Sequence, residues 1–260
     1  MGQDESSETH HGPGQGRTRL VAVVVTYNRL DKLKVTLARL LDSPAEDLQT
    51  VVVIDNASTD GTGDWLAAQD EPRLEVFRCA TNLGGAGGFV TGMRLASERF
   101  DPDWMVVMDD DARPVPGALE AFHETDRSVA DAWGAAVFHP GPERRICDMN
   151  RPAINPFWHP GVMWRTLTGQ GRDGFHMGPA DFRADAPQRD VDVLSFVGFF
   201  VSRAAIARVC YPDGSLFMRA RNYSPDLGRF LAEEPLWYSE NVGNLYEFAF
   251  NDPGGFSDPK

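Results

Sequence analysis

Three adjacent carboxylates, Asp109, Asp110 and Asp111, are the residues of this 260-residue chain best suited to chemistry. They end an apolar run that begins at Trp104, and prolines follow shortly after them. Adjacent acids repel one another, so folding alone does not favour them, whereas Mg²⁺ and Mn²⁺ bind carboxylate and phosphate oxygens. The triple aspartate therefore predicts a site for Mn²⁺ or Mg²⁺. The alternative is a solvated acidic turn, because runs of charge usually lie on the surface.

The elements that must position these acids follow from hydrophobic patterning. Continuous apolar runs of strand length alternate with segments of helical periodicity. This alternation predicts an α/β fold, with a mostly parallel, Rossmann-like sheet, right-handed crossovers and helices on both faces. We expect strands at 20–25, 51–54, 74–77 and from 104, and helices at 30–41, around 65–66, at 90–98 and at 117–122.

Polar residues follow each expected strand, and ligands bind parallel sheets at the carboxyl ends of the strands. Convergence of four polar stretches at one edge indicates a ligand site, although Gly and Asx residues often serve only to make turns. Glycines that begin a helix let a backbone approach a sugar or phosphate, and no dinucleotide or P-loop fingerprint is present. The candidate residues are Thr26, Tyr27, Asn28, Arg29, Asp55, Asn82, Gly84, Gly85, Asp109, Asp110 and Asp111.

Composition excludes several classes of function. The net charge of -13 argues against a nucleic-acid or anionic-membrane partner, since both need a basic footprint. The 3 cysteines are far apart, which indicates neither a disulfide framework nor a zinc site and suits a reducing, cytoplasmic compartment. No apolar stretch reaches the ~20 residues of a membrane span. A lipid-linked substrate would be met at the inner face of the membrane or through a partner.

The motifs resemble a known family. Val24–Arg29, Val53–Thr62, Asn82–Phe89 and Asp109–Pro114 are similar to the ordered motifs of family 2 glycosyltransferases with the GT-A fold. The Asn-Leu-Gly-Gly-Ala-Gly-Gly-Phe stretch with a triple aspartate most resembles the galactofuranosyltransferase-like branch. The resemblance covers roughly residues 19–218.

The resemblance implies a role for each matching residue. Thr26 and Asp55 would contact the nucleotide base, with Arg29 near the nucleotide. Asn82, Gly84 and Gly85 would line the sugar-nucleotide pocket. Asp109 and Asp111 would be the outer acids of a D-x-D motif, one facing the ribose and metal and the other the metal.

Residues 133–218 are expected to form the acceptor side, as a mixed extension of the sheet. Strands are predicted at 135–138 and 193–201, and the segment 141–189 between them is long enough to predict a functional loop or flap. Trp158 and Trp164 there would either stack on sugar faces or anchor the loop by packing, and we favour packing. The sequence also offers His139, His159 and His176 as third metal ligands, although structural or exposed roles are more common for single histidines.

The C-terminal segment departs from the family. Pro212–Met218 resembles the lead-in to an acidic motif that supplies the catalytic base, but Arg219 and Arg221 follow it and the acid is missing. Those arginines would instead suit a phosphate. Asp226 is our candidate base, because it lies in the nearest polar turn; Asp213, Glu233 and Glu234 are alternatives.

The resulting organisation is a disordered tail (1–17), a nucleotide-sugar-binding half (18–132), an acceptor-side half (133–218) and an atypical C-terminal segment (219–260). The first hypothesis is a metal-dependent inverting glycosyltransferase that moves a sugar, galactofuranose by resemblance, from a UDP-sugar to a glycan or lipid-linked glycan of the cell envelope. The second is a degenerate relative that binds a sugar nucleotide without transfer. The third is a nucleotidyltransferase, disfavoured because the expected basic Gly-rich loop does not follow the first strand.

Overall fold

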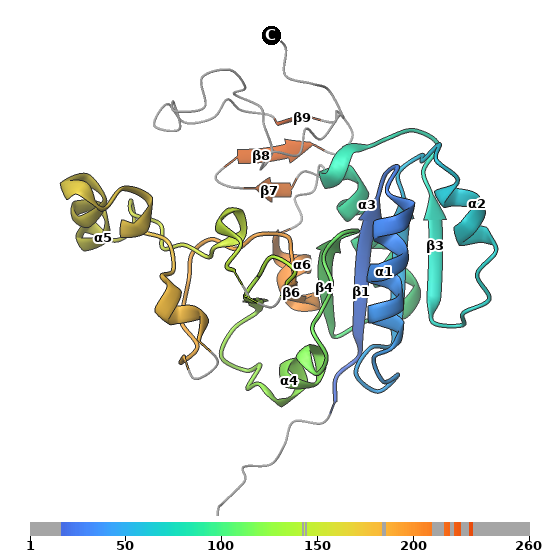
Figure 1. The fold of residues 1–260 in the computed structure, drawn as a ribbon, viewed down its shortest axis with the longest axis horizontal. Helices are drawn as coiled ribbons and strands as arrows, with labels where there is room; N and C mark the ends of the chain where they lie inside the picture. The colour runs from blue at the N-terminus through green and yellow to red at the C-terminus, as the bar shows by residue number, and fades with distance from the viewer. Residues whose placement is uncertain are drawn as a thin grey trace, which may run out of the picture.

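The computed structural model describes residues 17–141, 143, 145–183, 186–209, 216–218, 221–224 and 229–230. A six-stranded sheet has the order β3-β2-β1-β4-β6-β5 (Figure 1). Its first four strands run parallel, and β6 is antiparallel to both β4 and β5. The predicted α/β class and mostly parallel sheet are therefore confirmed. The strands are β1 (Leu20–Thr26), β2 (Thr50–Asp55), β3 (Leu74–Arg78), β4 (Trp104–Asp109), β5 (Ala132–Gly134) and β6 (Phe199–Ser202).

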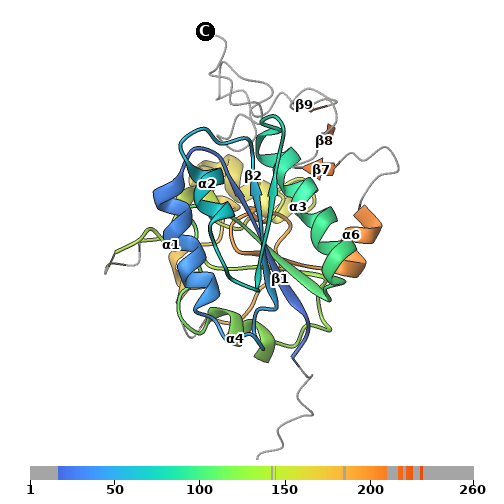
Figure 2. The ribbon, with the colours of Figure 1, turned by 90° about the vertical axis from the view of Figure 1, so that its right-hand side faces the viewer.

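Helices cover both faces of the sheet, as the apolar strands require. Figure 2 shows α1 and α2 on one face and α3 and α6 on the other. The first face forms a core in which Leu33, Leu37 and Leu40 of α1 join Phe122 of α4, and Phe89 belongs to the core on the second face. The helices are α1 (Leu30–Leu41), α2 (Thr62–Ala67), α3 (Gly84–Phe100), α4 (Ala118–Glu124), α5 (Pro160–Arg165) and α6 (Arg203–Val209).

The glycines of α3 serve helix packing. The helix begins at Gly84, six residues before the predicted start, so the Gly-rich stretch forms its first turns. A Cβ atom added at Gly88 would lie 2.6 Å from Val25 Cγ1, and one at Gly92 would lie 2.5 Å from Val23 Cγ1. At these two positions, close approach of α3 to β1 requires glycine. The sequence analysis had instead expected the glycines to let the backbone approach a sugar or phosphate.

The part of the chain that was expected to form the acceptor side differs from the sequence prediction in two places. The strand expected at 135–138 lies earlier, at β5, and Phe138 forms an isolated bridge to Ile146 outside the named strands. The strand expected at 193–201 begins only with β6, because Gly198 has a positive φ of 63° and interrupts the extended conformation just before it. A Cβ atom at Gly198 would lie 2.8 Å from Ala135 Cβ, so the bend also allows this segment to approach the β5 side closely.

The segment predicted as a loop at 141–189 contains short helical turns in its described part. They include α5 and the turns η1 (Asp148–Asn150), η2 (Thr166–Gln170), η3 (Gly171–Gly174) and η4 (Pro179–Phe182). A second sheet is formed by β7 (Leu216–Met218), β8 (Arg221–Ser224) and β9 (Arg229–Phe230). Among the described residues, no helix is both long enough and apolar enough to cross a membrane.

Candidate active site

The carboxyl ends of three neighbouring strands bring predicted site residues to one edge of the sheet. Thr26 of β1 pairs with Asp55 of β2, and Val25 of β1 pairs with Asp109 of β4. The Thr26 and Asp55 side chains are 1% and 0% exposed. Since adjacent parallel strands end together, the predicted convergence of Thr26, Asp55 and Asp109 is confirmed.

Asp110, the middle acid, points into the protein. Its Oδ2 accepts a hydrogen bond of 2.7 Å from Thr26 Oγ1, and its backbone oxygen accepts one of 2.7 Å from Thr36 Oγ1. Burial raises the pKa of Asp110, while the hydrogen bond from Thr26 and the charge of Arg29 oppose that rise. The middle acid therefore helps to fix the turn that carries the two outer acids.

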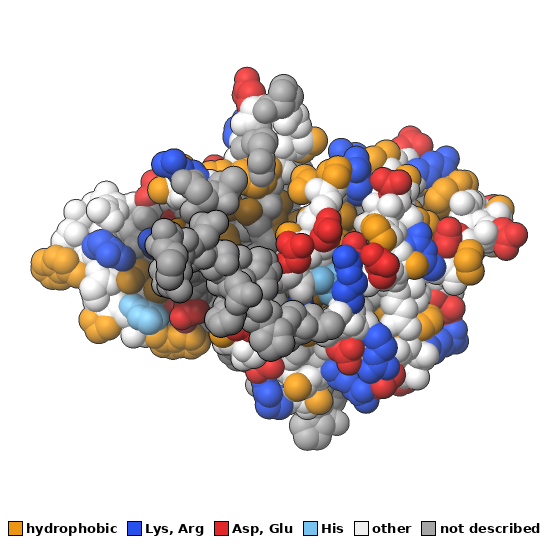
Figure 3. Space-filling model, turned by 90° about the horizontal axis from the view of Figure 1, so that it is seen from below, with side chains coloured by type: hydrophobic (Ala, Val, Ile, Leu, Met, Phe, Trp, Pro, Cys, Tyr) orange, Lys and Arg blue, Asp and Glu red, His pale blue; other side chains and the backbone are white. Residues whose placement is uncertain are grey.

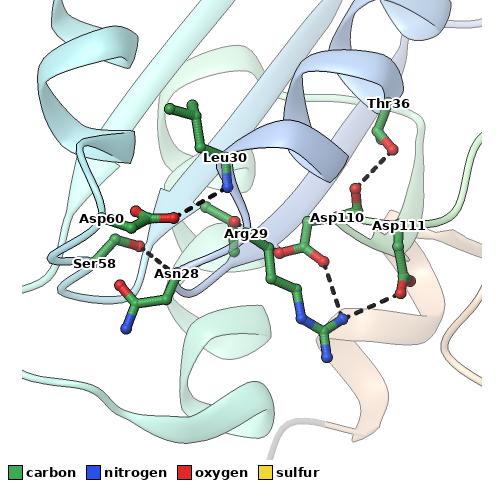
Figure 4. A network of polar contacts seen from close by, with 9 residues as sticks. Asn28, Arg29, Leu30, Thr36, Ser58, Asp60, Asp110 and Asp111 are labelled. Carbon is green, nitrogen blue, oxygen red and sulfur yellow. Dashed lines mark hydrogen bonds and ion pairs between the residues drawn. The ribbon is translucent and has the colours of Figure 1, made fainter.

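Arg29 is the cation of the acidic turn. Its Nη1 lies 3.4 Å from Asp110 Oδ1 and 3.1 Å from Asp111 Oδ2, as Figure 4 shows. The guanidinium therefore links the loop after β1 to the loop after β4. Because the Arg29 side chain is 52% exposed, solvent screens these ion pairs and the guanidinium can exchange one carboxylate for another anion.

The loops after β1 and β2 hold each other. Asn28 has a left-handed φ of 54°, its N–H donates to Ser58 Oγ at 3.0 Å, and its Oδ1 accepts from Thr59 N at 2.7 Å. Asp60 Oδ2 accepts from Leu30 N at 3.2 Å and so caps α1 from a neighbouring loop (Figure 4). Ser58 and Asp60 were missed as positioning residues, although Asx and Ser residues clustered after a strand were the available signal.

Asp55 keeps one carboxylate oxygen without a hydrogen bond. Its Oδ1 accepts from Ser58 N at 2.8 Å. Its Oδ2 is buried with no hydrogen-bond partner, and Arg78 Nε lies 3.4 Å away as an ion-pair partner. A buried acceptor without a donor is costly, so this oxygen suits an incoming N–H group.

A pair of asparagines connects β2 to the start of α3. Asn56 Nδ2 donates to Asn82 Oδ1 at 2.7 Å and to Gly84 O at 3.0 Å, while Asn56 Oδ1 accepts from Leu83 N at 2.8 Å. Asn82 Oδ1 also accepts from Gly84 N at 2.8 Å. Asn56 was not among the predicted site residues; it holds Asn82 and Gly84, which were.

Asp109 and Asp111 are the outer acids of the turn, and both were predicted as metal ligands. Burial, followed by the charges of Asp111 and Asp110, raises the pKa of Asp109 to about 7, against the opposing charge of Arg29. A divalent ion supplies the positive charge that this carboxylate lacks, so the donor set fits a hard cation. No group of three or more His, Cys, Asp or Glu side chains in the described part of the chain could hold a metal. The remaining ligands would therefore come from phosphate oxygens or water.

Several predicted residues lie elsewhere or make other contacts. Tyr27 is 43% exposed at the site edge, and a Cβ atom added at Gly85 would meet nothing within 4 Å. Two of the three candidate histidines contact other groups through one ring nitrogen, since His159 Nε2 lies 3.0 Å from Asp192 Oδ2 and His176 Nδ1 lies 2.9 Å from Arg172 O. Asp226, the predicted base, lies outside the described residues, as do Asp213, Arg219, Glu233 and Glu234.

The family model for Glycosyl transferase family 2 matches residues 21–177, which include every strand-end motif described above. This chain belongs to glycosyltransferase family 2. With its mostly parallel sheet, the chain is thus a glycosyltransferase with the GT-A fold, as the resemblance implied.

This family 2 chain is similar to several named glycosyltransferases. It is 31% identical over 184 residues to the undecaprenyl-phosphate mannosyltransferase of Micrococcus luteus, covering 70% of this chain and 73% of that protein. It is 28% identical over 204 residues to the galactofuranosyltransferase GlfT1 of Mycolicibacterium smegmatis, covering 76% of this chain but only 61% of the relative. The solved mannosyltransferase PcManGT of Pyrobaculum calidifontis, in complex with GDP-Man and Mn²⁺, is 25% identical with a TM-score of 0.39, covering 48% of this chain and 36% of that one.

Proposed function

We propose that this glycosyltransferase transfers a sugar from a UDP-sugar to a lipid-linked or polysaccharide acceptor, with Mn²⁺ or Mg²⁺ bound by Asp109 and Asp111. The observation that carries the proposal is the position of these outer acids at the strand ends, with the middle acid turned inward to Thr26. This arrangement leaves two carboxylates for a cation that also binds a diphosphate. Galactofuranose is the proposed sugar, supported by the similarity to GlfT1.

The uridine part of the proposal rests on Asp55. Its buried Oδ2 has no hydrogen-bond donor, and a uracil ring carries one N–H between two carbonyl groups. Arg78 covers this oxygen with a side chain that is 56% exposed, so the guanidinium can move aside without disrupting a core. Asn82 and Gly84, held by Asn56, would then line the sugar side of the pocket.

The proposed reaction needs a metal, a cation near the phosphates and a catalytic base. Asp109 and Asp111 would hold the metal, which would stabilise the negative charge that develops on the leaving diphosphate. Arg29 can release Asp111 and bind a phosphate oxygen in its place. Inversion at the sugar carbon requires a carboxylate that accepts the proton of the acceptor hydroxyl, and Asp226 is proposed for that task.

Calorimetric titration of UDP tests the proposal. With Mn²⁺ present we expect saturable binding that EDTA removes and that Asp111→Asn weakens at least about tenfold, because one charged metal ligand is lost. Asp70→Asn is the matched control, since Asp70 is an exposed acid that follows α2. Loss of binding in both variants, or UDP binding unaffected by EDTA, would contradict the assigned metal site. The same titration with GDP in place of UDP tests whether the site selects uracil.

Transfer itself separates an active enzyme from a degenerate sugar-nucleotide-binding relative. Purified protein is incubated with UDP-galactofuranose, Mn²⁺ and a lipid-linked glycan, and glycan mass is followed. A product absent with Asp111→Asn supports transfer at this site. UDP binding without transfer to any supplied acceptor would favour the degenerate relative.

A further inference from the structure

An aromatic-rich segment projects from the body of the molecule. We define the aromatic lobe as residues 149–177, which include α5, η2 and η3. Figure 1 shows α5 projecting from the body on the side opposite β3. Large apolar side chains are left in solvent here: Trp158 is 68% exposed, Trp164 69%, Leu167 72% and Met149 57%. The expectation that Trp158 and Trp164 anchor this segment by packing is therefore wrong.

The exposure belongs to a folded unit. Backbone hydrogen bonds of 2.8 Å close the lobe at its base, from Ile154 N to Phe175 O and from Met177 N to Pro152 O. A Cβ atom added at Gly174 would lie 2.9 Å from Thr166 N, so the turn after α5 packs closely on the helix end. Because these contacts hold the backbone, the exposure of the apolar side chains belongs to a folded segment and not to a frayed one.

The charge of the aromatic lobe opposes that of the chain. Between Asp148 and Asp173 the sequence holds no acid and three arginines, whereas the whole chain has a net charge of -13. Arg151 is paired with Asp173 at 3.0 Å and lies 3.6 Å from Asp148, whereas Arg165 and Arg172 are exposed. In Figure 3 the left end of the molecule shows hydrophobic atoms with Lys or Arg and His side chains among them.

Exposed tryptophan, leucine and methionine interleaved with arginine match one surface best. Indole rings prefer the boundary between lipid headgroups and acyl chains, and arginine binds phosphate there. A soluble glycan would use ring faces alone, and it gives no reason to expose Leu167 and Met149. The acidic net charge argued against an anionic membrane as a partner, but the charge of the aromatic lobe has the opposite sign.

We propose that the aromatic lobe docks on a phospholipid bilayer, with Trp158, Trp164 and Leu167 entering the interface and Arg165 and Arg172 binding lipid phosphates. The proposal rests on the proposed function only for its purpose, which is to hold the sheet edge where a lipid-linked acceptor is presented. Docking is reversible, because one small apolar patch binds a bilayer only weakly.

Flotation with vesicles tests the docking surface. The full chain is mixed with vesicles of phosphatidylcholine that contain about one-third phosphatidylglycerol, and the fraction that floats is measured. We expect the wild type to float and Trp158→Ser/Trp164→Ser to lower the partition coefficient about tenfold, because two indole rings no longer enter the interface. Arg165→Gln/Arg172→Gln is expected to remove the preference for the anionic lipid. Val115→Ser/Val129→Ser is the matched control, because these side chains are 64% and 69% exposed outside the lobe.

Each outcome decides the proposal. Flotation equal in the tryptophan and control variants, no flotation of the wild type, or loss of binding upon addition of a soluble glycan would overturn it. Calorimetry with UDP and Mn²⁺ on the tryptophan variant checks the fold and keeps the two proposals separate. UDP binding without flotation refutes docking alone, and flotation without UDP binding refutes the proposed function alone.

Discussion

Asp109 makes stability depend on pH at the scale of a single residue. Its pKa of about 7 lies above the value of ~3.9 for an aspartate in an unfolded chain. Between these values the native state binds more protons than the unfolded state, so the free energy of unfolding falls as pH rises through the window. Above pH 7 the native carboxylate is charged, and the full energetic cost of burying that charge beside two other acids lowers the free energy of unfolding.

Asp109→Asn removes that cost. In EDTA we expect the variant to exceed the wild type in free energy of unfolding, with the difference larger at pH 8 than at pH 5 by about 2–3 kcal/mol, because the two curves diverge only up to pH 7. Urea denaturation at both pH values measures this, with Asp70→Asn as control. A difference that is constant between pH 5 and pH 8 would mean that Asp109 does not titrate in that window.

The same residues show how far sequence reasoning reaches. Three adjacent acids after an apolar run located the edge, because strand ends and carboxylates are both visible in sequence. The sequence did not show that Asp110 turns inward toward Thr26, since this depends on side-chain direction at the end of β4. The loop contacts of Ser58 and Asp60 join residues about 30 positions apart, which only the assembled sheet brings together.

At the scale of elements, α3 shows that one motif can combine two demands. Gly84 is held at the site by Asn56, while Gly88 and Gly92 let the helix lie against β1. Sequence reasoning predicted the helix but began it at residue 90, and it could not say which glycines face a strand. Helix phase relative to the sheet decides that. The broken run at Gly198 has a similar origin, because its positive φ is a tertiary requirement.

Two alanine substitutions separate these demands. Gly88→Ala is expected to lower the free energy of unfolding by about 1–3 kcal/mol, because the new methyl group would lie 2.6 Å from Val25 Cγ1. Gly85→Ala is the matched control, since nothing lies within 4 Å of its added Cβ atom, and a gain of up to ~1 kcal/mol is expected from helix propensity. Urea denaturation in the absence of ligand compares them. Equal effects of the two substitutions would show that α3 does not pack closely on β1.

At the scale of the whole molecule, charge is distributed unevenly. The chain has 38 Asp and Glu residues against 25 Lys and Arg, yet the aromatic lobe has no acid between Asp148 and Asp173. The net charge therefore does not describe the lobe, because a total hides local patterns. The mostly parallel sheet with helices on both faces was predictable from strand and helix alternation. The projection of α5 away from the sheet was not, since no periodicity reports where an irregular segment packs.

This uneven charge predicts opposite responses to salt. In metal-free buffer, raising NaCl from 0.05 M to 0.5 M should increase the free energy of unfolding by about 1 kcal/mol, because screening weakens repulsion among the excess carboxylates. The same change should weaken flotation with anionic vesicles, since it screens Arg165 and Arg172 from lipid phosphates. Urea denaturation and flotation in matched buffers measure the two effects, and Arg165→Gln/Arg172→Gln should lose only the second. A wild-type protein that is destabilised by salt would mean that its surface ion pairs outweigh its net repulsion.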